Sequence, residues 1–337
     1  WTASKGSTSL VVAVLDSGIT RHTDLDGQTV AGYDFVGNRV SAPEGTEGWY
    51  PSGDGDGWDS NPTDPGNPYD DPNNPDDDAE WHGTHVAGII GAVRGNKKGG
   101  DGVADNVLIM SVRAVPNGDE HDKDVANAIR YAVDNGAKVI NMSFGKSFSP
   151  YHEKVQEAIQ YAVSKDVLMI HAAGNDASDI DYTDNFPKKP VFDYIDSTSR
   201  KLFLNIGANT KESGDALVAS FSNFGAMEVD VFAPGHDIYN SVPQSDYAKL
   251  NGTSMAAPMV AGVAALLQGY FPTLTMKEIK EIMLKSAKSY KGTQQLKPGS
   301  TTEKVDFSTL SVTGGVVNVK NAVKMCMALE KSKAGTK

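Results

Sequence analysis

The chain has 337 residues, 39% of them hydrophobic, and 43 acidic against 31 basic residues give a formal net charge of -12 at pH 7. Twelve of the acidic residues fall between Arg39 and Arg94, a stretch without lysine or arginine. We expect no nucleic-acid or anionic-membrane partner, because both need basic patches.

Simple patterns in the sequence exclude a membrane-spanning protein and a fold held together by an intramolecular disulfide. No apolar run approaches the ~18 residues of a membrane-spanning helix. The chain has one cysteine, Cys326, so an intramolecular disulfide is impossible, and its apolar helical context predicts a small buried residue. The first residues lack the basic-then-apolar pattern of a signal peptide, so we expect any export signal or pro-segment to be absent from this chain.

Short apolar runs alternate with helical patterns along most of the chain. The runs predict strands over 10–16, 107–115, 138–143, 167–175 and 201–208. Helices are predicted around 83–94, 122–135, 151–165, 254–270 and 275–287. Continuous apolar strands interleaved with helices indicate an α/β fold whose mostly parallel sheet carries helices on both faces.

Ligands of such sheets bind outside the carboxyl ends of the strands. The residues that end the predicted strands are therefore candidates for a site: Asp16, Ser143, Phe144, Gly145, Gly174 and Asn175.

Two regions depart from the alternating pattern. Residues 43–80 are rich in Gly, Pro, Asn and Asp and should form no long regular element. Near the end, we predict a pair of strands over 303–310 and 314–319, then a helix to about 330. We expect one main domain over 1–290, with 291–337 as an extension packed on it.

Ser254 precedes a run of small apolar residues and admits two interpretations. It could cap the helix, as Ser often does. It could also be a nucleophile at the positive end of the helix, which requires a base, an orienting acid and an oxyanion site. Pro258 is expected near the helix start, where the amides lack intrahelical partners.

The base should be one of seven histidines. Surface roles are expected for His22, His121, His152 and His236, and a core position for His171 within an apolar strand. His82 and His85 stand at the start of an apolar helix. Helical zinc motifs space their histidines at i and i+4 with an intervening glutamate, so the spacing of three argues against zinc. Asp16 ends a strand before a turn, where it could cap a helix or orient a base.

Three segments taken together resemble a known family. VAVLDSGI (12–19), HGTHVAG (82–88) and GTSMAAPMVAG (252–262), in this order, are similar to the signature blocks of the subtilisin-like serine proteases. The resemblance extends through KVINMSFG (138–145) and AAGN (172–175). It covers roughly residues 8 to 290 and implies a three-layer subtilisin-like fold with a catalytic domain over 1–290.

The resemblance also implies roles for four residues. Asp16 would orient the imidazole of His82, His82 would act as general base and then acid, and Ser254 would attack the scissile carbonyl. The Asn175 side chain, helped by the Ser254 backbone amide, would stabilise the oxyanion.

Substrate-binding residues follow from the same resemblance. Residues 143–145 would pair with an extended peptide and wall the first specificity pocket, with 118–120 as the opposite strand. The residues implied are Ser143, Phe144, Gly145, Gly118, Asp119, Glu120, Ala173 and Gly174, with Asp176 and Asn185 at the rim and base of the pocket and Phe144 and Val125 as outer apolar walls. Residues 118–124 are charged rather than small and neutral. We expect large apolar P1 residues to be accepted, and basic ones to be tolerated because of the nearby acids.

Calcium is expected in the Asp-rich stretch DGDGWDSNPTD (54–64), since Ca²⁺ prefers carboxylate and carbonyl oxygens. It is not an EF-hand, because the twelfth-position Glu and flanking helices are missing. The ligand candidates are Asp54, Asp56, the Trp58 carbonyl and Asp64. A second site, implied by the resemblance, would use Asp24 with Asn96 or Asp101.

The sequence therefore predicts a secreted, monomeric serine endopeptidase that acts on extended protein segments and has an N-terminal pro-segment. A catalytically inactive homologue that serves as a binding scaffold is the alternative. An esterase is disfavoured, because that class has a G-x-S-x-G elbow and its histidine last in the chain.

Overall fold

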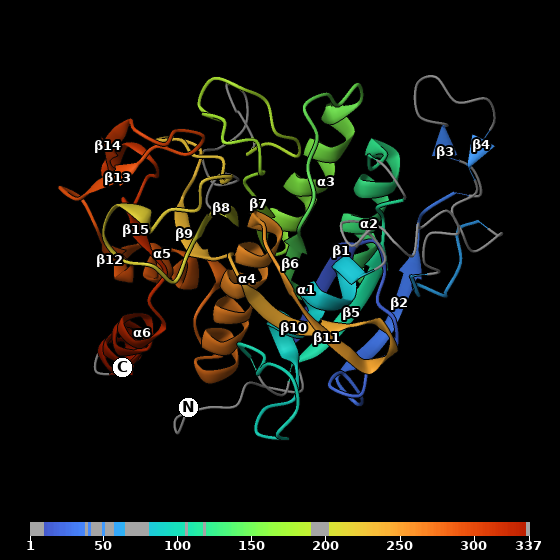
Figure 1. Ribbon diagram of the computed structural model, residues 1–337. Coiled ribbons are helices and arrows are strands. Elements are labelled where there is room, and N and C mark those ends of the chain that lie inside the picture. Colours follow the sequence, from blue (N-terminus) through green and yellow to red (C-terminus); the bar gives the residue numbers. More distant parts are fainter. Residues whose placement is uncertain are drawn as a thin grey trace.

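The computed structural model describes residues 10–37, 40–41, 49–50, 57–64, 81–104, 107–116, 119–189 and 202–334. A nine-stranded sheet forms the centre of the molecule, in the order β12-β15-β9-β8-β7-β6-β1-β5-β2 (Figure 1). Its strands are β1 (Val11–Asp16), β2 (Thr29–Asp34), β5 (Leu108–Arg113), β6 (Ala137–Met142), β7 (Leu168–Ala172), β8 (Phe203–Asn209), β9 (Val231–Pro234), β12 (Lys288–Ser289) and β15 (Gly315–Val316). All neighbours pair in parallel except β12 and β15.

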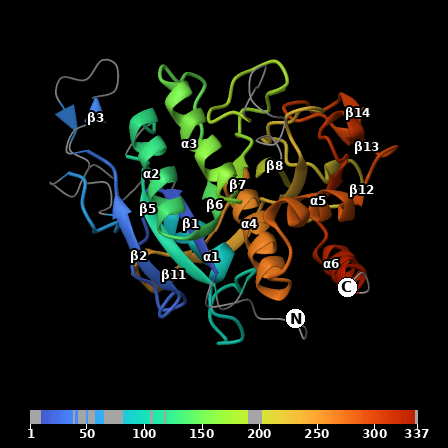
Figure 2. The same cartoon turned by 180° about the vertical axis from the view of Figure 1, so that it is seen from behind.

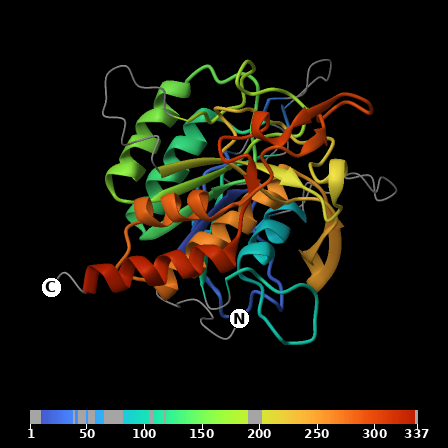
Figure 3. The same cartoon turned by 90° about the vertical axis from the view of Figure 1, so that its left-hand side faces the viewer.

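Helices cover both faces of this sheet (Figures 2 and 3). One layer consists of α2 (Asp122–Asp134) and α3 (His152–Ser164). The other contains α1 (His82–Gly91), α4 (Thr253–Tyr270), α5 (Met276–Ser286) and α6 (Val319–Ala334). The predicted α/β fold with a mostly parallel sheet is confirmed.

The side chains of β1 show how the sheet separates two cores. Val12 and Val14 belong to the core shared with α1, α4, α5 and α6, whereas Ala13 and Leu15 belong to the core under α2 and α3. Successive strand residues point to opposite faces. The continuous apolar run of this strand therefore follows from burial on both sides.

The helices differ in how much of their surface is buried. On α2, Val125, Ala128, Ile129 and Ala132 recur at helical spacing and form one buried stripe. On α4, small and apolar residues are buried on almost every side. Because α4 is enclosed in this way, the position of its first turn is fixed by core packing.

Several smaller elements were missed or misassigned in the sequence. Two of them, β10 (Ile238–Val242) and β11 (Asp246–Leu250), form a hairpin against α1. The pair of strands predicted over 303–310 and 314–319 is present as β14 (Lys304–Asp306) and β15, but the two do not pair with each other. Instead, β14 pairs with β13 (Gln294–Leu296), and β15 pairs with β12 and β9. A further short pair joins β3 (Val40–Ser41) to β4 (Trp49–Tyr50).

The C-terminal part contributes to the central layers. A hydrogen-bonded strand of this region, β15, lies within the main sheet, and α6 packs against α5. Cys326 on α6 is fully buried, as predicted. The domain division at residue 290 stays a prediction. None of the helices that the structure describes is long and apolar enough to cross a membrane.

Candidate active site

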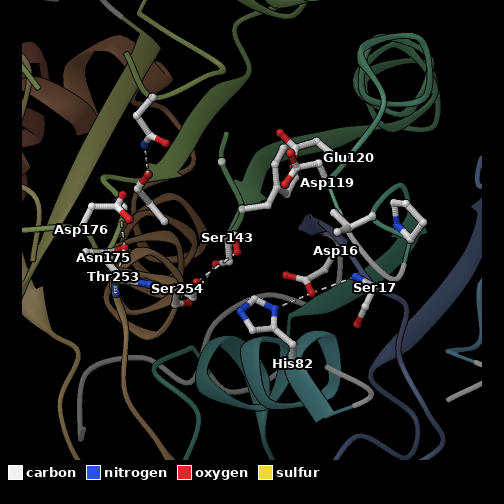
Figure 4. Close-up of a pocket in the computed structure, with 17 residues that line it drawn as sticks. Asp16, Ser17, His82, Asp119, Glu120, Ser143, Asn175, Asp176, Thr253 and Ser254 are labelled. Atoms are coloured by element: carbon white, nitrogen blue, oxygen red, sulfur yellow. Dashed lines mark hydrogen bonds and ion pairs between the residues drawn. The ribbon is translucent and has the colours of Figure 1, made fainter. Parts of the chain in front are cut away.

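A cleft of about 420 Å³ opens at the carboxyl edge of the sheet. Its lining combines residues that follow β1, β6 and β7 with the first turns of α1 and α4 (Figure 4). Twelve of the predicted site residues line it: Asp16, His82, Asp119, Glu120, Ser143, Phe144, Gly145, Gly174, Asn175, Asp176, Asn185 and Ser254.

Asp16 and His82 are in direct contact. The His82 Nδ1 atom donates to Asp16 Oδ1 at 2.6 Å, and the same oxygen accepts the Ser17 amide at 2.8 Å. The Asp16 side chain is 3% exposed and that of His82 is 30% exposed. The other edge of the imidazole therefore remains accessible from the cleft.

Two glycines allow this contact. A Cβ on Gly83 would lie 2.0 Å from the carbonyl oxygen of Gly18, so only glycine lets the start of α1 approach the turn after β1 so closely. Gly18 itself has a φ of 117°, which disfavours other residues. The glycines beside Asp16 and His82 thus bring the two side chains together.

Ser254 is the second residue of α4, and Gly252 occupies the N-cap position. The capping interpretation of Ser254 is therefore wrong. Its hydroxyl donates to the Ser143 carbonyl at 3.1 Å, and the Ser143 hydroxyl donates to the Ser254 carbonyl at 2.8 Å. In Figure 4 the His82 ring lies between Asp16 and Ser254.

Pro258 is the sixth residue of α4, beyond the first turn where free amides occur. The expected explanation for this proline is therefore wrong. In an uninterrupted helix its amide would donate to the Ser254 carbonyl, but proline has no N–H. The Ser143 hydroxyl supplies the donor instead, and so ties the first turn of α4 to the segment that follows β6.

Asn175 is held by a residue that the sequence reasoning did not single out. Its Oδ1 atom accepts two hydrogen bonds from Thr253, from the amide at 2.8 Å and from the hydroxyl at 2.9 Å. The Thr253 hydroxyl also accepts the Gly174 amide at 3.0 Å. With Oδ1 engaged, the Nδ2 group is the free donor of the amide. The adjacency of Thr253 to Ser254 was the available signal.

Asn185 lines the cleft beside Gly145. Its Nδ2 group donates to the carbonyls of Ala172 at 3.1 Å and Ala173 at 2.9 Å. A Cβ on Gly145 would lie 2.4 Å from Asn185 Oδ1, so the amide fills the space beneath this glycine. Ala173 is buried behind the cleft and contributes its carbonyl rather than a side-chain wall.

The opposite wall carries Asp119 and Glu120, while Gly118 lies outside the described residues. Glu120 is 4% exposed, and burial raises the pKa of its carboxyl to about 7. Val125 differs from expectation: it is 2% exposed, belongs to the core under α2, and lines a small cavity behind Glu120 rather than the cleft.

His85 and His171 are buried and have structural contacts. The Nε2 atom of His85 lies 2.9 Å from the Ile238 carbonyl, on the hairpin. His171 Nε2 lies 2.8 Å from the Phe144 carbonyl, which anchors the wall of the cleft. Burial lowers both pKa values to about 4.

Within the described part of the chain, no three His, Cys, Asp or Glu residues gather where they could hold a metal.

The second calcium site expected at Asp24 does not fit the contacts. Asp24 Oδ1 accepts a hydrogen bond from the side-chain amide of Asn96 at 2.5 Å, and Oδ2 accepts one from the Tyr247 hydroxyl at 2.7 Å. Asp101 accepts the Gly95 amide. Both Asp24 oxygens are thus engaged by protein donors, and Asn96 turns a donor rather than an oxygen toward them.

The first calcium site is only partly within the described residues. Asp54 and Asp56 lie outside them. Trp58 packs its ring against Phe35, with centroids 5.5 Å apart. Asp64 lies beside the turn after β1, where a Cβ on Gly18 would be 2.6 Å from its amide nitrogen.

Comparison with known proteins agrees with this geometry. The model of the subtilase family matches residues 7–309. The chain belongs to the subtilase family. It is 37% identical over 269 residues to a thermophilic serine proteinase of Bacillus sp. (strain AK1), covering 79% of this chain and 54% of that protein.

Other subtilases show the same range of similarity. Thermitase of Thermoactinomyces vulgaris is 36% identical, over 79% of this chain and 77% of thermitase. An extracellular protease of Xanthomonas campestris is 36% identical, over 85% of this chain and 48% of that protein. The chain thus spans about half the length of several curated relatives.

Solved structures support the subtilase fold. A protease from Pseudoalteromonas arctica superposes with a TM-score of 0.75 at 30% identity, covering 97% of this chain and 92% of that one. A cold adapted subtilisin-like serine proteinase gives a TM-score of 0.63 at 26% identity, covering 92% and 90%.

Proposed function

We propose that this subtilase is a serine endopeptidase whose triad is Asp16, His82 and Ser254. The observation that carries the proposal is the 2.6 Å contact between His82 and Asp16 in the cleft that Ser254 also lines. A carboxylate at Nδ1 fixes the imidazole tautomer that presents a basic Nε2. A serine hydroxyl needs such a base to become nucleophilic at neutral pH.

In the proposed mechanism His82 removes the Ser254 proton as Ser254 Oγ attacks the substrate carbonyl. The developing imidazolium is stabilised by Asp16. His82 then protonates the leaving amine, and water hydrolyses the acyl-enzyme by the same steps in reverse. The Ser254 hydroxyl donates to the Ser143 carbonyl at 3.1 Å and lines the same cleft as His82.

Asn175 and the Ser254 amide are the proposed oxyanion donors. Because the Asn175 carbonyl oxygen is engaged by Thr253, its Nδ2 group is oriented before substrate arrives. Donors held in place need no reorganisation as negative charge develops, which is the main source of their effect.

Substrate would bind as an extended strand between residues 143–145 and the segment ending at Glu120. Backbone pairing of this kind demands little of the sequence, so we propose broad specificity for unfolded or extended protein segments. The first pocket, with Asn185 at its base and Asp176 at its rim, is proposed to accept apolar P1 side chains and to tolerate basic ones.

Calcium is proposed for the Asp-rich segment but not for Asp24. Residues 57–64 are anchored next to the turn that follows Asp16. The Pro62 carbonyl accepts hydrogen bonds from the Ile19 amide at 3.3 Å and from the Ser111 hydroxyl at 3.1 Å. The oxygens of Asp54, Asp56, Trp58 and Asp64 are of the kind that Ca²⁺ binds. A bound ion would stabilise this anchor by mass action.

We further propose that the protein is secreted, monomeric and made with an N-terminal pro-segment. Secretion is supported by relatives named extracellular proteases, from Xanthomonas campestris and Dichelobacter nodosus. Protein or peptide substrates are its proposed partners.

Labelling with a fluorophosphonate and hydrolysis of casein test the proposal. The chain should be labelled at Ser254 and should degrade casein, and Ser254→Ala should abolish both. Labelling without casein hydrolysis would indicate a different serine hydrolase. Absence of both from the correctly folded chain would favour the inactive scaffold.

A further inference from the structure

We propose that Asp119 and Glu120 form a subsite for a lysine or arginine side chain of the substrate, on the acyl side of the scissile bond. This inference rests on the proposed peptidase function and names its substrate class. The two residues lie opposite Asn175 and Asp176, with Ser143 between the two sides (Figure 4).

The charge of the cleft points to a cationic partner. Besides Asp16, its lining contains three carboxylates, Asp119, Glu120 and Asp176. The described lining contains no lysine or arginine. Field lines concentrate in a cleft of one charge sign and favour ligands of the opposite sign.

Glu120 adds a second and independent observation. The residue is only 4% exposed, and its Oε1 atom has no hydrogen-bond partner among the described residues. A buried carboxylate oxygen without a partner is unfavourable, because its lost hydration is not replaced. A cation brought by the substrate would supply the missing partner.

The nearest lysine is already committed elsewhere. Lys146 places its ammonium group 2.9 Å from Asp122, and also donates to the backbone carbonyl of Glu120. Asp122 in turn accepts from the Ser149 hydroxyl at 2.6 Å and the Tyr151 amide at 2.8 Å. This network neutralises Lys146 locally and leaves the Glu120 carboxyl without a dedicated counter-ion.

The position of the wall decides which part of the substrate is recognised. Residues 143–145 are proposed to wall the pocket for the substrate residue that supplies the scissile carbonyl. Glu120 would face the bound peptide from the other side. A peptide strand between the two walls presents alternate side chains to each face. The basic residue is therefore expected at P2, P3 or P4 rather than on the leaving-group side.

Protonation of Glu120 should modulate the preference. Burial raises the pKa of this carboxyl to about 7, and the charges of Asp119 and Asp122 act in the same direction, opposed by Lys146. The titratable groups facing it are Asp119, Asp122, Lys146 and His152, with Asp16 and His82 across the cleft. A ratio between two substrates on one enzyme cancels pH effects that are common to both, so the lysine preference itself should increase from pH 6 to pH 8 as Glu120 ionises.

The experiment compares peptides that differ at a single position from P1 to P4, with lysine or the uncharged norleucine there. Binding to Ser254→Ala is measured by fluorescence anisotropy, and cleavage by the chain with Ser254 intact is measured as kcat/KM. Lysine at one of P2 to P4 should be favoured about tenfold, the effect of one charge-assisted hydrogen bond. Glu120→Gln should abolish most of this ratio, and Asp119→Asn should reduce it.

Two further variants complete the design. Glu281→Gln, a matched change of an exposed residue on α5, should leave the ratio at its original value. A ratio that survives Glu120→Gln, or one removed by Asp176→Asn alone, would overturn the proposal. A binding preference that depends on Glu120 in a chain that cleaves no peptide would support the subsite and refute the peptidase function.

Discussion

Thr253 holds Asn175 with two hydrogen bonds to one oxygen, from its amide at 2.8 Å and from its hydroxyl at 2.9 Å. Since an asparagine amide has one oxygen and one NH₂ group, this arrangement decides which end faces the cleft. The residue before the proposed nucleophile, Ser254, therefore controls the orientation of the proposed oxyanion donor. Thr253 is a positioning residue rather than a catalytic one.

The first prediction follows from this contact. Thr253→Val removes the hydroxyl but keeps the shape and the backbone amide, so kcat should fall about tenfold with little change in KM. Asn175→Ala should lower kcat by about 10²–10³, as expected for an oxyanion donor. Steady-state kinetics with a peptide anilide measures both. Thr253→Ser, which keeps the hydroxyl, is the control. An unchanged kcat in Thr253→Val, or a change confined to KM, would argue against positioning.

A second prediction concerns the depth of the first pocket. Asn185 fills the space under Gly145, so Asn185→Gly should deepen the pocket and raise kcat/KM for phenylalanine at P1 relative to alanine by about tenfold. Two hydrogen bonds to Ala172 and Ala173 are lost, which should lower the free energy of unfolding by about 1–2 kcal/mol.

The P1 change is measured with paired peptide anilides, and the stability change by urea unfolding. Asn185→Asp keeps the size of the side chain and serves as the control for volume. A phenylalanine-to-alanine ratio that does not rise in Asn185→Gly would place the base of the pocket elsewhere.

The third prediction is a loss of stability in acid. His85 and His171 each have a pKa lowered by burial to about 4, against 6.5 when unfolded. Between these values the unfolded chain binds more protons than the folded one. The contribution of the two histidines to the free energy of unfolding is therefore fully present above about pH 6.5 and decreases toward pH 4. Each histidine contributes a slope of about 1.4 kcal/mol per pH unit, up to about 3 kcal/mol for each of the two.

Urea unfolding of the Ser254→Ala variant between pH 4 and 7 checks the slope without autolysis. His171→Gln keeps a donor near the Phe144 carbonyl but does not titrate, so the slope should become shallower by about one proton. His236→Gln, at a site outside the buried pair, should not change it. An unaltered slope in His171→Gln would contradict the prediction.

How much of this site the sequence predicts depends on how far apart in the chain the contacting residues lie. The order of Asp16, His82 and Ser254 and the strands that end near them follow from local patterns, because apolar periodicity and turn chemistry are local. The contacts of Asn185 with Ala172 and Ala173 and of Lys146 with Asp122 depend on how loops fold onto the sheet. Sequence alone does not specify such contacts.

The errors have the same origin. The segments 303–310 and 314–319 have strand-like composition, but their partners are set by the free edge of β9 and by β13, which lie elsewhere in the chain. Val125 is apolar and close in sequence to Asp119 and Glu120. The helical period nevertheless directs its side chain toward the core under α2. Strand pairing and helix rotation, not composition, decided both cases.

The last prediction tests calcium. Removing Ca²⁺ with EDTA should lower the melting temperature of the Ser254→Ala variant by several degrees, because an ion that binds only the folded state stabilises it. Excess Ca²⁺ should restore it and excess Mg²⁺ should not, since Mg²⁺ demands a smaller octahedral shell. Asp64→Asn should remove most of the response. Asp24→Asn should keep it, because the Asp24 oxygens are already engaged by Asn96 and Tyr247. A response lost in Asp24→Asn but kept in Asp64→Asn would move the ion to the site that the hydrogen bonds argue against, and no response to EDTA would exclude calcium from both.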